Sequence, residues 1–133
     1  MRKPVKCIVL ILLTLLFSAC KGATGKMIEV KDDPLPVKVM YHQMWESYAE
    51  GESTDPELIR QLLSELSSLK IGDRTNMAYD DFGDRIIFEY SDGTQMVYYF
   101  EGDIFVMEDG SRYEVEGVDS LRDILSPLIP EEY

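Results

Sequence analysis

Cysteine is scarce in this chain of 133 residues, and both copies, Cys7 and Cys20, lie within the first twenty positions. No cysteine follows Cys20. This distribution excludes a disulfide framework, a thiolate metal site and a cysteine nucleophile from the rest of the chain. The fold must therefore be held by an ordinary hydrophobic core, which a chain of this length can supply.

Histidine is limited to His42, and no G-x-S-x-G nucleophile elbow occurs. A Ser-His-Asp arrangement would have to use His42, and its neighbours Tyr41 and Gln43 form no known catalytic motif. We therefore expect no catalytic residue, and we predict that the protein is not an enzyme.

Basic residues are few as well, with 13 Lys and Arg against 25 Asp and Glu and a net charge of −12. Nucleic-acid binding depends on a basic footprint that neutralises phosphates. The acidity therefore predicts no nucleic-acid partner. It favours a well-solvated surface that stays clear of anionic lipid.

The first twenty residues have the pattern of a secretory leader. A basic start is followed by the apolar run CIVLILLTLLF at 7–17 and by two small residues, Ser18 and Ala19. The run has 11 residues, whereas a membrane-spanning helix needs roughly 17–25. The leader therefore predicts export rather than a permanent transmembrane helix.

Residues 16–20, LFSAC, resemble a bacterial lipobox, in which an apolar residue and small residues precede a cysteine. The resemblance implies that residues 1–19 are removed and that Cys20 carries a diacylglycerol. Such a lipid would anchor the protein to the cell membrane on its extracytoplasmic side. Residues 20–26 would then be a lipidated cysteine with a flexible linker, and 27–133 a single domain. An ordinary secretory signal with an incidental cysteine is the alternative.

The first half of this domain predicts a strand and two helices. Residues 27–31 have strand composition. Residues 37–50 are compatible with a helix or a strand. Val37, Tyr41 and Met44 recur at helical spacing, which favours a helix ended by Gly51. Residues 37–41 also have the composition of a strand. Pro56, after a capping Asp55 or Thr54, opens a helix with a leucine stripe that Gly72 ends.

The second half shows a hydrophobic period of two, with tight turns at Asp92-Gly93, Gly102-Asp103 and Asp109-Gly110. It predicts strands at 76–79, 85–90, 95–101, 104–107 and 112–115, and then a helix from Asp119 or Ser120. The fold class is therefore α+β: an antiparallel β-meander of four to five strands packed with two to three helices. Both faces of the predicted strand at 96–100 are apolar, so we expect one face to pack against the helices. The other is either a partner surface or is covered by the N-terminal elements.

Two groups of side chains are candidate metal ligands. Met40, His42 and Met44 would share one face of a strand, and two thioethers with an imidazole suit Cu(I), with Trp45 nearby. On a helix, Met40 and Met44 would align and His42 would point elsewhere. Acidic turns, such as the one with Asp80, Asp81 and Asp84, could bind Ca²⁺, but they lack EF-hand spacing, and turn chemistry alone explains them. We expect no cofactor.

The part after the leader resembles a group of small bacterial lipoproteins, mostly from Gram-positive lineages, that has no established function. The resemblance rests on TDPELI at 54–59, IFEYSDGT at 87–94 and RYEV at 112–115. It implies no catalytic residues. The sequence thus predicts a lipid-anchored extracytoplasmic binding or interaction domain, with an envelope protein as the expected partner. The alternative is an extracytoplasmic copper carrier that uses Met40, His42 and Met44.

Overall fold

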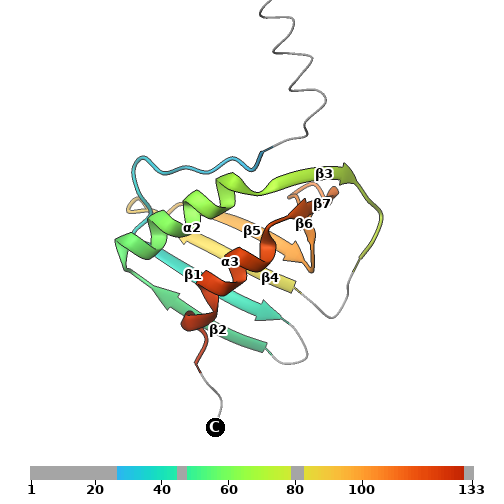
Figure 1. The fold of residues 1–133 in the computed structure, drawn as a ribbon. Helices are drawn as coiled ribbons and strands as arrows, with labels where there is room; N and C mark the ends of the chain where they lie inside the picture. Colours follow the sequence, from blue (N-terminus) through green and yellow to red (C-terminus); the bar gives the residue numbers. More distant parts are fainter. Residues whose placement is uncertain (1–26, 45–47, 79–82, 131–133) are drawn as a thin grey trace, which may run out of the picture.

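The computed structural model describes residues 27–44, 48–78 and 83–130. The leader, Cys20, Trp45, Asp80 and Asp81 lie outside these ranges. Within them, one antiparallel sheet of seven strands carries two helices (Figure 1). The α+β class is confirmed, and the expected four to five strands were too few. Along the chain the elements are β1 (Lys38–Met44), β2 (Tyr48–Ser53), α2 (Pro56–Ser68), β3 (Lys70–Arg74), β4 (Gly83–Glu89), β5 (Gln95–Glu101), β6 (Ile104–Val106), β7 (Arg112–Glu116), α3 (Val118–Leu125) and the 3₁₀ turn η1 (Ser126–Leu128).

The strand order across the sheet is β2-β1-β4-β5-β6-β7-β3. Consecutive strands pair as hairpins from β4 to β7, as the turn residues predicted. Gly93, Gly102 and Gly110 adopt positive φ angles at these turns, which glycine does without strain. Each of the helices in the described ranges is too short or too polar to cross a membrane.

The favoured helix over 37–50 was wrong, because this stretch forms β1 and β2. Val39 and Tyr41 of β1 are buried, and β1 pairs with β4 over its whole length. Gly51 ends no helix but lies within β2. A Cβ there would collide with the carbonyl oxygen of Leu128, so the C-terminal turn η1 packs directly on this backbone.

Two expected strands are absent from the described residues, and β3 is a further strand that was missed. Residues 27–31 and 76–78 carry no regular structure. The chain segment around Gly72, expected to end a helix, forms β3 instead and pairs with β7 at the sheet edge. The sequence of this strand lacks the apolar–polar alternation that predicts a strand, because only Ile71 is buried and the other residues are exposed.

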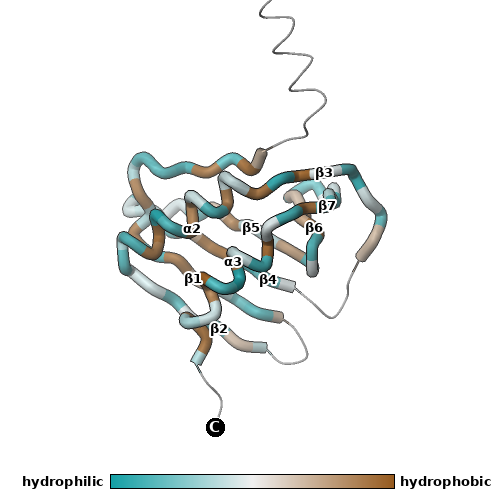
Figure 2. The backbone as a smooth tube through the Cα atoms, viewed as in Figure 1, coloured by the Kyte–Doolittle hydropathy of each residue, from teal (hydrophilic) through white to brown (hydrophobic). Residues whose placement is uncertain are grey.

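Both helices begin close to their predicted positions. Asp55 caps α2 by accepting a hydrogen bond from the Glu57 amide at 3.0 Å, and Pro56 occupies the first turn. Helix α3 follows Gly117 and begins one residue before the expected Asp119. Figure 2 shows hydrophobic residues recurring along both helices and the central strands.

The core lies between the helices and one face of the sheet, here called the inner face. The helices contribute the buried side chains of Ile59, Leu62, Leu63, Leu66, Val118, Leu121 and Leu125. The strands contribute those of Val39, Tyr41, Ile86, Phe88, Tyr98, Phe100, Phe105 and Val115. The segment before β1 lies on this side too, because Tyr98 and Tyr90 donate hydrogen bonds to the carbonyl oxygens of Glu29 and Lys31.

Candidate functional site

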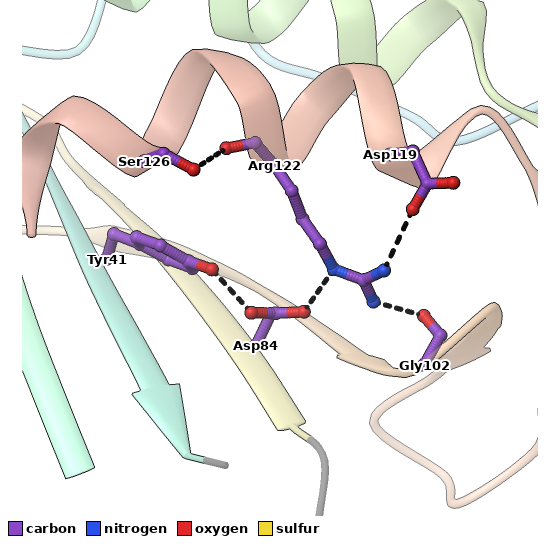
Figure 3. Close-up of polar contacts among 6 residues, drawn as sticks. All are labelled: Tyr41, Asp84, Gly102, Asp119, Arg122 and Ser126. Carbon is purple, nitrogen blue, oxygen red and sulfur yellow. Dashed lines mark hydrogen bonds and ion pairs between the residues drawn. The ribbon is translucent and has the colours of Figure 1, made fainter. Parts of the chain in front are cut away.

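A buried polar cluster joins helix α3 to the sheet (Figure 3). The Asp84 side chain of β4 accepts a hydrogen bond of 2.5 Å from the Tyr41 hydroxyl and one of 2.8 Å from Arg122 Nε. Arg122 also donates to the Gly102 carbonyl oxygen at 2.5 Å and contacts the Asp119 carboxylate at 3.3 Å. One carboxylate thus connects β1, β4 and α3, and the arginine extends the connection to the β5–β6 turn.

This cluster has the properties of a structural anchor. Asp84 is only 1% exposed, so a solute has almost no access to its carboxylate. Burial, followed by the hydrogen bond to Asp84, raises the pKa of Tyr41 well above its ordinary value, so the phenol remains a hydrogen-bond donor at neutral pH. Asp84 was grouped by sequence with the acidic turn as a possible Ca²⁺ ligand. That grouping fails, because both carboxylate oxygens already bind partners inside the protein.

The opposite face of the sheet, the outer face, is partly accessible at its centre, where Ile87 is buried, Val97 is exposed and the other side chains are half-buried. Its centre is formed by Met40, Ile87, Val97, Tyr99 and Val106, which alternate along their strands with core residues. Met40, Ile87 and Val97 lie side by side on three strands, and Tyr99 lies beside Val106. Val97 is 46% exposed. None of the described helices covers this face, since both pack on the inner face.

A depression of about 420 Å³ lies over the centre of the outer face. It is lined by Arg85, Ile87, Gln95, Val97, Tyr99, Val106, Met107 and Glu108. The Arg85 guanidinium lies 5.9 Å from the centre of the Tyr99 ring, a cation–π distance. Gly83 makes room for this ring, because a Cβ there would meet the Tyr99 hydroxyl. The depression thus combines apolar walls with a cation and an aromatic ring, as ligand sites commonly do.

Ion pairs border the outer face on two sides. Lys38 lies between Glu52 and Glu89 at 3.3 and 3.7 Å. On the other side, Arg112 pairs with Glu101 through two hydrogen bonds. Burial, followed by the charge of Glu101, raises the pKa of Tyr99. A polar rim around an apolar centre is the ordinary anatomy of a protein interface.

The candidate copper ligands also lie on the outer face. Because Lys38–Met44 form strand β1, Met40, His42 and Met44 occupy alternate positions of a strand, as the copper hypothesis requires. Met40 and Met44 are four residues apart, about 13 Å along a strand. A sulfur ligand lies about 2.3 Å from its metal, and strand side chains stand perpendicular to the sheet, so the two thioethers cannot share one ion. His42 lies 3.7 Å from Glu50.

Oxygen-rich metal sites are not formed by the described residues: no three of their His, Asp or Glu side chains gather around a common point. The turn at Asp109-Gly110 uses its carboxylate internally, because Asp109 accepts a hydrogen bond from the Ser111 amide at 2.9 Å. Asp92 does the same with Thr94. These contacts support turn chemistry as the reason for both aspartates.

The comparisons with known proteins add no relative. No protein-family model, curated protein or solved structure matches the chain.

Three arginines were missed by sequence reasoning: Arg85, Arg112 and Arg122. Arg85 was hard to find because it lies in a strand whose apolar residues dominate the pattern. Arg122 pairs with a carboxylate 38 residues away. The only local sign of Arg122 is that it follows Leu121 of the apolar helix stripe. This position does not indicate which carboxylate it pairs with.

Proposed function

We propose that the protein is a lipid-anchored extracytoplasmic binding domain without enzymatic activity, which presents the outer face of its sheet to an envelope protein. Lipid on Cys20 holds it at the membrane, and residues 21–26 connect the anchor to the domain. The excess of acidic over basic residues, which removal of the basic leader increases, keeps the domain away from anionic lipid and leaves the outer face accessible.

One observation carries this proposal: both helices and the segment before β1 pack on the inner face, while the outer face has an apolar centre. In an antiparallel sheet with a solvated face, that face is normally polar. Val97 and Met107 are instead 46% and 40% exposed, beside the partly exposed Tyr99 and Met40. Accessible apolar surface with a charged rim is typical of an interaction site.

The test is site-specific photocrosslinking in intact cells. Tyr99 is replaced by p-benzoylphenylalanine, which keeps an aromatic ring at the same place in the depression. The matched control carries the same residue at Gln61, an exposed position of α2 on the other side of the molecule. We expect discrete adducts of one protein from Tyr99 and none of that protein from Gln61. Identical adducts from both positions, or none from Tyr99, would refute the outer face as the binding surface.

An extracytoplasmic copper carrier is the second candidate, favoured by the alternate placement of Met40, His42 and Met44 on one strand face. With the two sulfurs too far apart to share an ion, His42 and one methionine would form a two-coordinate Cu(I) site. Titration with Cu(I) against a competing chelator should then saturate at one equivalent. Binding should be lost in His42→Ala and kept in a Glu52→Gln control. Equal Cu(I) uptake by the chain and by His42→Ala would exclude this candidate.

A further inference from the structure

Strand β6 is much shorter than its neighbour β5. It pairs with Tyr99, Phe100 and Glu101 only, and after Val106 the chain turns away through Met107 to Gly110. Residues 95–98 of β5 therefore extend about 13 Å beyond their partner on that side. The sheet has a notch at this point, although β5 is a central strand.

Along the notch, the backbone of β5 has no partner strand among the described residues. The bond from the Tyr90 amide to the Thr94 carbonyl closes the β4–β5 hairpin. Because antiparallel ladders alternate, Met96 and Tyr98 then bond to β4, whereas Gln95 and Val97 direct their N–H and C=O groups toward the notch. The pairing of Tyr99 and Glu101 with β6 has the same phase. No backbone hydrogen bond among the described residues reaches Val97 from that side.

A groove of about 690 Å³ occupies the notch. Its apolar lining comes from both faces of the sheet and from the segment before β1: Met27, Ile28, Ile71, Met96, Val97, Tyr98, Phe105, Val106, Met107 and Tyr113. Its remaining lining residues are Glu29, Glu108 and Asp109, and none of the Lys or Arg residues in the described ranges lines it. The groove thus joins a free strand edge to apolar walls and an acidic rim.

We propose that this groove binds an extended peptide segment of a partner, in which apolar and basic side chains alternate, by adding it as a strand to residues 95–98 of β5. Backbone bonds at Gln95 and Val97 hold the segment, as in other cases of strand addition. The apolar side chains fill the groove, and the basic ones face Glu29, Glu108 and Asp109. This inference deepens the proposed function by naming the partner's chemistry, since the groove shares Val97, Val106 and Met107 with the outer-face depression.

The experiment measures binding of fluorescent eight-residue peptides to the full-length protein in detergent by anisotropy. The probe alternates valine and lysine. One control alternates valine and glutamate, and a second keeps the valine–lysine sequence with N-methyl groups on alternate amides. We expect saturable binding of the probe alone. The first control reverses the charge of the peptide, and the second removes the peptide N–H groups that would bond to β5.

Backbone variants separate strand addition from simple attraction to an acidic protein. Val97→Pro deletes the N–H that points into the notch, which leaves the β4 pairing intact. Val97→Thr keeps the N–H and the shape. We expect Val97→Pro to weaken probe binding at least tenfold relative to Val97→Thr. Circular dichroism establishes that both variants are folded.

Charge variants give a second measurement that does not depend on the strand. Glu29→Gln with Glu108→Gln should weaken binding about fivefold at low salt, the effect of losing two exposed ion pairs. The control is Glu65→Gln with Asp123→Asn, which removes the same amount of charge from the two helices, away from the groove. It should leave binding unchanged. Equal binding of all three peptides, or equal losses in both double variants, would overturn the inference. The Tyr99 crosslink does not depend on these peptides, so its persistence would leave the proposed function standing.

Discussion

Replacement of Asp84 by asparagine tests whether the buried cluster anchors α3. The change keeps the shape of the side chain and removes the charge that faces Arg122, whose side chain is 17% exposed. Removing one partner of a buried ion pair costs about 3–5 kcal/mol. We expect about 3 kcal/mol, the lower end, because Tyr41 can still donate to the amide oxygen and Arg122 keeps its bond to the Gly102 carbonyl.

The assay is urea unfolding followed by far-UV circular dichroism, with linear extrapolation to water. At a slope of about 1.5 kcal/mol per molar urea, the expected loss lowers the midpoint by about 2 M. Tyr41→Phe should cost less, about 2 kcal/mol, since it removes a single hydrogen bond to a charged group.

Asp119→Asn is the matched control. Its carboxylate also contacts Arg122, at 3.3 Å, but its side chain is 92% exposed. The free energy of unfolding should therefore stay within about 0.5 kcal/mol of the unchanged protein. A loss below about 1 kcal/mol in Asp84→Asn, or equal losses in both variants, would contradict the anchoring role.

Three further predictions concern pH, packing and the anchor. Burial raises the pKa of Tyr98 to about 12 from an ordinary value of 10.0, so its contribution to stability is complete below pH 10 and is lost between about pH 10 and 12. Unfolding followed against pH should show this loss, and Tyr98→Phe should flatten it. Gly51→Ala should destabilise the protein by about 1–3 kcal/mol through its clash with Leu128, whereas Gly72→Ala, which meets only ordinary contacts, should cost less than about 1 kcal/mol by the same urea assay. Cys20→Ser should leave the precursor unlipidated and uncleaved in whole-protein mass spectrometry; an unchanged mature N-terminus would refute the anchor.

The hairpins of the second half were predictable because their signals are local. An Asp-Gly or Gly-Asp pair between alternating apolar residues specifies the turn, and the strands on either side follow from it. Strand β5 was therefore predicted with its observed bounds, residues 95–101. The capped start of α2 was predictable for the same reason, since Asp55 and Pro56 act within one turn of helix.

The buried cluster was not predictable in this way. Asp84 follows Gly83 and two further aspartates, so its local sequence indicates a solvated turn. Its burial depends on Tyr41 and Arg122, which lie 43 and 38 residues away. Only the sheet topology brings three such distant side chains together, and one sequence without an alignment carries no record of it.

The error over residues 37–50 has a physical cause that bears on function. A half-buried strand is recognised by apolar and polar residues in alternation. In β1 the inward Val39 and Tyr41 are interleaved with outward Met40 and Met44, which are also apolar, so the alternation is blurred and a helical spacing fits as well. The same property blurs β5, where Val97 and Tyr99 face outward. Since the helices in the described part of the chain cover only the inner face, packing against them does not explain the apolar residues on the outer face. Places where local pattern and global fold disagree are commonly functional, and here the disagreement coincides with the face proposed to bind a partner.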